Sequence, residues 1–156
     1  MKMQNLPHAD LEKGDAVQAL LTAADGTRFG VAICYEDAYG AEQLYALPDA
    51  GLLINVSNDA WFGDSIAPHQ HLEIARMRSL EFGRAALRST NTGISAFIAA
   101  DGELLQTGRQ FTPERLTGQI QPRRGLTPYA GTGNWPVIGL CIAILGFFWI
   151  RNRARL

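Results

Sequence analysis

Lysine is scarce in this sequence, and the two that occur, Lys2 and Lys13, both lie near its start. The other basic residues are arginines, and acidic and basic side chains nearly balance to a formal net charge of −1. A chain without a basic excess lacks the electrostatic attraction that brings proteins to nucleic acids. We therefore expect no nucleic-acid partner.

Cysteine is equally rare. Cys34 and Cys141 lie in two separate apolar runs, so a disulfide between them is not expected. Without paired cysteines, the composition does not indicate whether the protein works in an oxidising compartment. His69 and His71 flank a single residue, so they would not share a helix face, and no third ligand lies at metal spacing. A zinc site is therefore not expected. We expect neither a metal nor another cofactor.

Charge is absent from residue 125 to residue 150. Within this stretch residues 135–150 are almost wholly apolar, and as a helix they would span about 24 Å, close to the hydrocarbon thickness of about 30 Å. Trp135 and Trp149 lie near the two ends, as aromatic residues do at membrane interfaces. We predict a transmembrane helix. The alternative is a core helix at the end of a soluble domain. A core helix, however, is rarely apolar on all faces.

The position of this apolar run defines the expected domain organisation. The first stretch, Met1–Asp15, is polar and has no apolar core, so no signal peptide is predicted. The predicted parts are a domain over residues 1–124, a linker over 125–134, the membrane helix over 135–150 and a basic tail over 151–156.

The stretch that suggests chemistry is Phe29–Asp37. Phe29–Ile33 is a short apolar run that predicts a strand buried on both faces, and it ends at Cys34. A thiol at a strand end, followed at once by Tyr35 and Glu36, can act as a nucleophile held on a rigid element. Most free cysteines are instead small core residues, and the stretch alone leaves both interpretations open.

The rest of the pattern predicts an α/β core. A second apolar strand, Gly51–Ser57, follows a short helix over Gly40–Leu47, and it too ends among polar residues. Functional sites of α/β folds gather at such strand ends. An aromatic loop, Ala60–Gly63, comes next, and loop aromatics are often exposed or face a ligand. The other predicted elements are a strand over Ala16–Thr22, a hairpin turn at Ala24–Thr27, a helix over His69–Arg84, and strands over Gly93–Ala100, Glu103–Gln106 and Arg115–Gln121.

Five segments carry recognisable motifs: Val31–Glu36, Asn55–Gly63, His69–Arg84, Arg88–Gly93 and Leu126–Pro136. The most specific motifs are the Asn-Asp-Ala-Trp-Phe-Gly run and the Ala-Arg-Met-Arg sequence of the predicted helix. Together these segments resemble the apolipoprotein N-acyltransferases, membrane enzymes of the nitrilase superfamily.

The resemblance implies a fold and a chemistry. The expected fold is α/β, a partial nitrilase-type αββα sandwich followed by one C-terminal transmembrane helix. The family moves an acyl chain from a phospholipid to a cysteine thiolate, and then to the N-terminal amine of a diacylglyceryl-modified lipoprotein. By resemblance Cys34 is the nucleophile, the backbone N–H of Tyr35 is an oxyanion donor, Glu36 is a supporting carboxylate, buried and paired with a lysine, and Trp61 contacts substrate.

The family also uses a general-base glutamate and a lysine, which lie upstream of the segment that matches here. Neither Lys2 nor Lys13 lies in a motif like the family's lysine motif. The chain is therefore expected to be the C-terminal part of such an enzyme, to need the missing N-terminal half, and to be inactive alone. The alternative is a catalytically silent, membrane-anchored module that binds lipid or a partner, while the apolar tail disfavours a soluble nitrilase-type amidase.

The resemblance implies a location as well. The nitrilase-like domain is expected in the periplasm, attached to the bacterial inner membrane, with the C-terminus in the cytoplasm. Arg151, Arg153 and Arg155 follow the apolar run, whereas only Arg123 and Arg124 precede it closely, and this bias agrees slightly with a cytoplasmic C-terminus.

Overall fold

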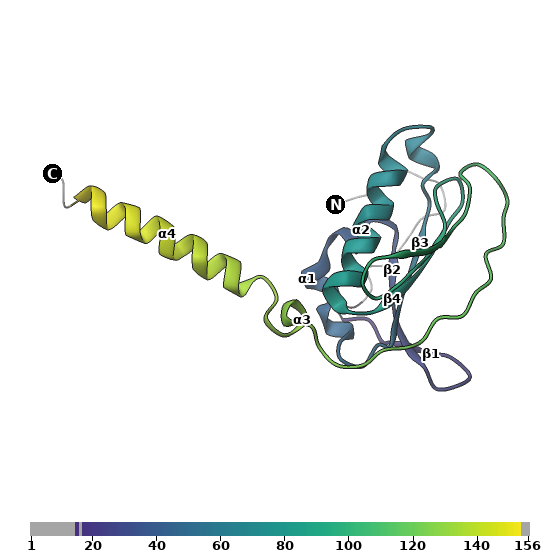
Figure 1. Ribbon diagram of the computed structural model, residues 1–156, viewed down its shortest axis with the longest axis horizontal. Coiled ribbons are helices and arrows are strands. Elements are labelled where there is room, and N and C mark those ends of the chain that lie inside the picture. Colours follow the sequence, from purple (N-terminus) through teal and green to yellow (C-terminus); the bar gives the residue numbers. More distant parts are fainter. Residues whose placement is uncertain (1–14, 16, 154–156) are drawn as a thin grey trace.

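The computed structural model describes residue 15 and residues 17–153. Its centre is a six-stranded mixed sheet in the order β1-β2-β3-β4-β5-β6 (Figure 1). The three middle strands, β2 to β4, run parallel to one another, and the outer pairs are antiparallel. The strands are β1 (Leu21–Thr22), β2 (Arg28–Ile33), β3 (Leu52–Ser57), β4 (Ala85–Thr90), β5 (Ala96–Ile98) and β6 (Leu104–Thr107).

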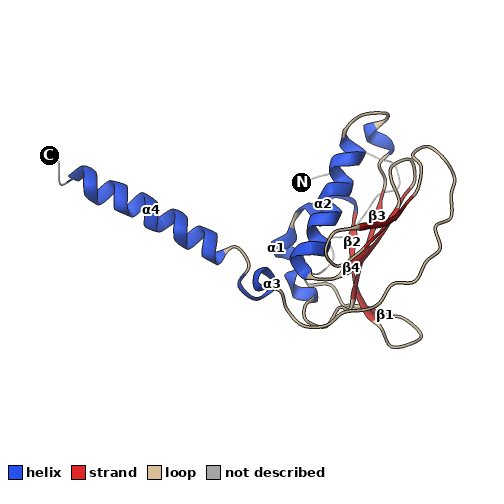
Figure 2. Ribbon diagram, in the orientation of Figure 1, coloured by secondary structure: helices blue, strands red, loops and turns tan. Residues whose placement is uncertain are grey.

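Helices connect the parallel strands and lie on one side of the sheet (Figure 2). The short helices η1 (Cys34–Ala38), α1 (Gly40–Gln43) and η2 (Leu44–Ala46) join β2 to β3, and η3 (Ala60–Phe62) and α2 (Ala67–Phe82) join β3 to β4. Parallel neighbours require such crossover connections. The C-terminal part contains α3 (Pro128–Thr132) and α4 (Trp135–Arg153).

The core lies between α2 and the sheet. Residues at helical spacing on α2, among them Leu72, Ala75 and Phe82, are buried against the β3 and β4 side chains Leu53 and Ala86. Complete burial of a side chain such as Phe82 contributes roughly 1.5–3 kcal/mol. The predicted α/β class, the two apolar strands and the helix over residues 69–84 are therefore confirmed. The expected burial of Phe29–Ile33 on both faces is wrong, because α2 covers only the face of Gly30 and Ala32, whereas Ile33 on the other face is exposed.

Two predicted strands differ in the structure. The strand expected over 16–22 is only Leu21–Thr22, and residue 16 lies outside the described residues. The strand expected over Arg115–Gln121 is wrong, because this segment is a connection without regular structure and most of it is exposed. Its alternating sequence gives no buried face, and a strand forms only where a neighbouring strand pairs with its backbone.

The connection into the C-terminal helices is attached to the domain by Arg84, a buried side chain between α2 and β4. Its guanidinium donates to the carbonyl of Ala50 (2.5 Å), to that of Pro48 (3.2 Å) and to that of Gly125 (2.8 Å). Tyr129 of α3 stacks on Phe82 at a centroid distance of 6.4 Å. Three segments that are distant in sequence are thus held together at this point.

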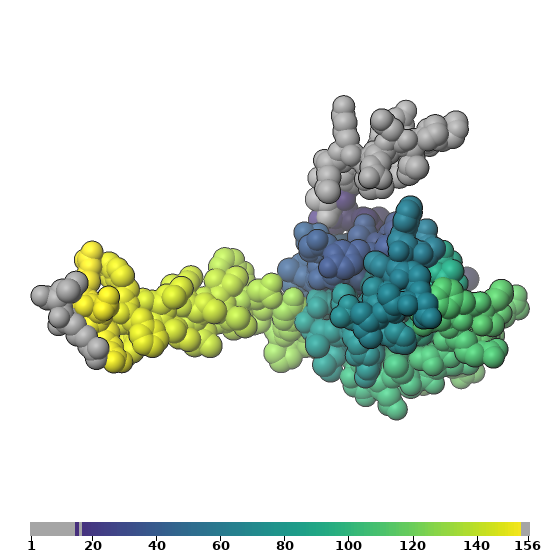
Figure 3. All heavy atoms as spheres, turned by 90° about the horizontal axis from the view of Figure 1, so that it is seen from above, coloured from purple at the N-terminus to yellow at the C-terminus, as the bar shows by residue number. Residues whose placement is uncertain are grey.

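Helix α4 is long and apolar enough to cross a membrane. None of its apolar window is buried against the rest of the described chain, and Figure 3 shows it extending away from the α/β domain. A core helix would be covered, so the exposed apolar surface favours the transmembrane interpretation over the alternative.

Candidate active site

Cys34 lies where β2 ends and η1 begins. Its φ angle is +54°, in the left-handed region that residues other than glycine seldom adopt. The Cys34 Sγ lies 3.4 Å from the hydroxyl oxygen of Ser57, at the end of β3. The Cys34 carbonyl accepts hydrogen bonds from Asn55 Nδ2 (3.0 Å) and His71 Nε2 (3.3 Å). Strained backbone that its surroundings hold in place is typical of functional sites.

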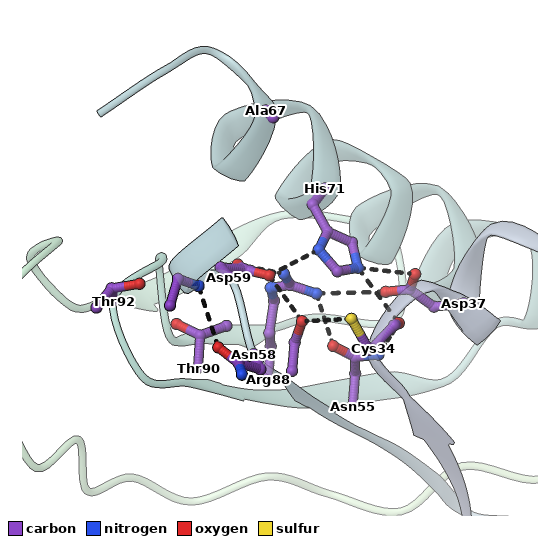
Figure 4. Close-up of polar contacts among 12 residues, drawn as sticks. Cys34, Asp37, Asn55, Asn58, Asp59, Ala67, His71, Arg88, Thr90 and Thr92 are labelled. Atoms are coloured by element: carbon purple, nitrogen blue, oxygen red, sulfur yellow. Dashed lines mark hydrogen bonds and ion pairs between the residues drawn. The ribbon is translucent and has the colours of Figure 1, made fainter. Parts of the chain in front are cut away.

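A buried polar cluster lies directly behind this cysteine (Figure 4). We define the cluster as Asp37, Asn55, Asp59, His71 and Arg88, all at most 5% exposed. Register explains part of it, because β3 and β4 place Asn55 opposite Arg88 on the same face of the sheet. The Arg88 guanidinium donates to Asn55 Oδ1 (2.6 Å), to Asp59 Oδ2 (3.0 Å) and to Asp37 Oδ2 (3.3 Å).

His71 joins the two carboxylates from the opposite side. Its Nδ1 lies 3.0 Å from Asp59 Oδ1, and its Nε2 lies 3.2 Å from Asp37 Oδ1. The neighbours of both ring nitrogens are oxygens that can accept hydrogen bonds, and this arrangement favours the doubly protonated, imidazolium form of His71. With Arg88 it then balances the charges of the two aspartates, which is the condition for burying four ionisable groups together.

The environment of His71 changes its pKa in the direction that this geometry requires. Burial alone would lower it, and so would the charge of Arg88. The hydrogen bond to Asp37 and the charges of Asp37 and Asp59 outweigh these effects, so the pKa of His71 is raised above its usual value.

This shift predicts a pH dependence of stability. Because the folded-state pKa of His71 is raised, its contribution is fully present below about pH 6.5 and is lost as the pH rises through the folded-state pKa. The free energy of unfolding of the full chain, measured by urea titration in detergent, should fall in that window by at most about 1.4 kcal/mol per pH unit. His71→Gln should flatten this slope. His69→Gln changes an exposed residue of the same helix and should retain it; equal slopes in all three proteins would contradict the assignment.

Gly93 makes room for this cluster in the loop after β4. A Cβ atom at this position would lie 2.1 Å from Asp59 Oδ2, so a side chain there would displace the carboxylate. Asp59 also accepts a hydrogen bond from Ser57 Oγ (2.7 Å), and its N–H donates to Asn91 Oδ1 (3.0 Å). The last residue of the Arg88–Gly93 motif is therefore explained by close packing.

The predicted site residues lie at the carboxyl ends of two parallel strands, Cys34 to Glu36 directly after β2 and Trp61 shortly after β3. The Tyr35 ring is exposed and packs edge-on against Tyr39 at 5.9 Å. Trp61, in η3, is 83% exposed, and the neighbouring Phe62 ring meets His71 edge-on.

Glu36 differs from its prediction. We expected a buried carboxylate paired with a lysine, but the residue is exposed and its Oε2 accepts a hydrogen bond from the backbone N–H of Ile33 (2.7 Å). The carboxylate therefore closes the turn that carries Cys34. Both lysines lie outside the described residues.

Sequence reasoning missed three members of the buried cluster: Asp37, His71 and Arg88. A signal existed for His71, which lies four residues before Ala75 and so extends the apolar face of α2. A polar residue on such a face must find partners. Within the described part of the chain, no set of three or more His, Cys, Asp or Glu side chains is arranged to hold a metal ion.

Comparison with known protein families gives a match over most of the chain. The model of the family described as carbon-nitrogen hydrolase matches residues 5–129, and the chain belongs to this family. A carbon-nitrogen hydrolase from Helicobacter pylori gives a TM-score of 0.47 at 18% identity, over 54% of this chain and 37% of that chain.

Among curated proteins the chain is similar to apolipoprotein N-acyltransferases. It is 51% identical to that of Methylococcus capsulatus, over 95% of this chain and 29% of the relative. It is 46% identical to that of Haemophilus influenzae, over 90% of this chain and 27% of the relative. The resemblance seen in the motifs is confirmed, and the chain spans less than a third of the length of these relatives.

Proposed function

We propose that this chain contributes the nucleophile of an N-acyltransferase. The acyl donor is a phospholipid and the acceptor is the N-terminal amine of a diacylglyceryl-modified lipoprotein. The observation that carries the proposal is a partly buried cysteine, in a left-handed conformation at a strand end, in a chain 51% identical to an apolipoprotein N-acyltransferase.

The proposed chemistry has two steps. The Cys34 sulfur attacks the ester carbonyl carbon of the phospholipid, the carbon–oxygen bond breaks, and the lysophospholipid leaves with the electron pair and a proton. The amine of the lipoprotein then attacks the thioester, forms an amide, and returns the thiol. The Tyr35 N–H stabilises the oxyanion in both steps, Glu36 supports the nucleophile turn, and Trp61 contacts the acyl chain.

A base that activates the thiol and an ammonium group beside the oxyanion complete this chemistry. We assign both to the part of the relatives' length that this chain does not span. The chain alone is then expected to be inactive toward a phospholipid. It should still react with an activated ester, whose leaving group needs no proton, and pass that acyl group from the thioester to an unprotonated amine.

The proposed location is the bacterial inner membrane. Helix α4 spans the bilayer, the α/β domain lies in the periplasm, and the C-terminus lies in the cytoplasm. Arg151 and Arg153, in the last turn of α4, support this orientation because basic residues are enriched on the cytoplasmic side.

The test uses the full chain in detergent with p-nitrophenyl palmitate, followed by a synthetic diacylglyceryl-cysteine peptide. We expect a palmitoyl thioester on Cys34 by mass spectrometry, formed faster than on N-acetylcysteine at the same pH, and then an N-acylated peptide. A catalytically silent module would show Cys34 alkylation by iodoacetamide but no faster thioester formation and no transfer.

The exposed Trp61 supplies a separate prediction. Trp61→Ala should slow thioester formation from the palmitoyl ester about tenfold, because a large aromatic contact with the chain is lost. The rate with the p-nitrophenyl acetate control, which has no long chain, should stay within about twofold. If the wild-type chain and Trp61→Ala formed the thioester from the palmitoyl ester at equal rates, Trp61 would have no role in substrate binding.

A further inference from the structure

The peptide bond between Cys34 and Tyr35 is held from inside the domain. Its carbonyl accepts a hydrogen bond from Asn55 Nδ2 on β3, at 3.0 Å, and one from His71 Nε2 on α2, at 3.3 Å. Both donors are buried. The carbonyl therefore points into the buried polar cluster.

A trans peptide is planar, and its C=O and N–H point in opposite directions. Since the Cys34 carbonyl points inward, the Tyr35 N–H points away from the buried polar cluster, and the residue that carries it is 56% exposed. This outward direction is the one that a donor to a substrate oxyanion requires.

The two inward donors have no freedom to turn away. The Asn55 oxygen accepts from Arg88 Nη1 at 2.6 Å, so its amide nitrogen must face the Cys34 carbonyl. His71 is fixed by Asp59 on one nitrogen and by Asp37 on the other. A side chain whose every alternative orientation breaks a buried hydrogen bond acts as a rigid support.

We propose that Asn55 and His71 are positioning residues that aim the Tyr35 N–H at the oxyanion. The inference rests on the proposed acyl transfer at Cys34. Neither side chain touches the substrate; each acts through the carbonyl of the same peptide. The ionisable groups around this peptide are Asp37, Asp59, His71 and Arg88 of the cluster and the exposed Glu36.

Two reagents separate this role from a general effect on the thiol. In acylation by p-nitrophenyl palmitate the sulfur attacks the carbonyl carbon, negative charge develops on the oxygen, and p-nitrophenolate leaves with the electron pair. In alkylation by iodoacetamide the sulfur displaces iodide from a saturated carbon, and no oxyanion forms. An oxyanion donor therefore accelerates only the first reaction.

The experiment compares both rates in a Cys141→Ala background, where Cys34 is the remaining cysteine. Asn55→Asp keeps the shape and the acceptor for Arg88 but replaces the donor with an oxygen. His71→Gln removes the bridge between the carboxylates. We expect each to slow acylation about tenfold, because the other donor remains, while alkylation stays within about twofold. His69→Gln, an exposed control on α2, should change neither rate.

Three outcomes would overturn the inference. Acylation and alkylation slowed equally would assign the two residues to the thiol itself, and unchanged acylation would assign them no part in the reaction. Loss of cooperative unfolding in both variants would assign them to stability. Failure of the proposed function has a different signature, namely a wild-type chain that forms no thioester at Cys34, and the inference then fails with it.

Discussion

Replacing Cys34 with alanine should abolish formation of the acyl-enzyme. Without the sulfur there is no atom on η1 that can form a thioester, and the adjacent Ser57 hydroxyl is engaged with the Asp59 carboxylate at 2.7 Å. Cys34→Ser should lower the yield of acyl-enzyme, which would be an oxygen ester, almost as far, because a serine hydroxyl ionises far less readily than a thiol. The measurement is mass spectrometry of the full chain after incubation with p-nitrophenyl palmitate.

Cys141 provides the matched control for this experiment. It is exposed on α4, in the segment assigned to the membrane, and far along the chain from the buried polar cluster. Cys141→Ala should leave the yield of acyl-enzyme unchanged. A palmitoyl group found on Cys141 in the wild-type chain, or a Cys34→Ala variant that still transfers acyl groups to the peptide, would refute the assignment of the nucleophile.

The largest loss of stability should come from Arg88. Arg88→Met removes one of two positive charges from the cluster and leaves Asp37 and Asp59 with only His71 as a cationic partner. Breaking a buried charge pair in this way costs about 3–5 kcal/mol. Whole domains are stable by only about 5–15 kcal/mol. Urea titration of the full chain in detergent, followed by circular dichroism, measures the loss directly.

Arg28 offers a control of the same residue type. It pairs with Asp49 at 2.7 Å, but both side chains are about half exposed. An exposed pair of this kind contributes at most about 1 kcal/mol, so Arg28→Met should change the free energy of unfolding little. If the two arginine variants lost stability equally, the buried cluster would have no special importance for the fold.

The elements that periodicity defines were predictable from the sequence. Phe29–Ile33 and Gly51–Ser57 are apolar because they are central strands, and the spacing of Leu72, Ala75 and Phe82 is the spacing of a buried helix face. The Arg115–Gln121 segment alternates without forming a strand. Pairing depends on a neighbour in space, which a local pattern does not contain.

The site was predictable only in part. The position of Cys34 at a strand end follows from the apolar run before it, and the turn residues after it are adjacent in sequence. The buried cluster joins Asp37, His71 and Arg88 through contacts between η1, α2 and β4. Sequence alone did not show that their charges balance, because balance depends on which side chains the tertiary fold buries together. It also did not show that Glu36 faces outward.

Arg84 determines how the α/β domain is connected to the segment that leads to α4. Its guanidinium joins the carbonyls of Pro48 and Ala50 to that of Gly125, on the path to α4. Gly125, which precedes α3 and α4 in the chain, is therefore fixed to the segment just before β3. A planar fork of donors can hold several carbonyls at once, whereas the single ammonium of lysine holds fewer. In the proposed arrangement with α4 in the bilayer, this attachment limits how far the domain can move from the membrane surface, and with it the height of the Cys34 thiol.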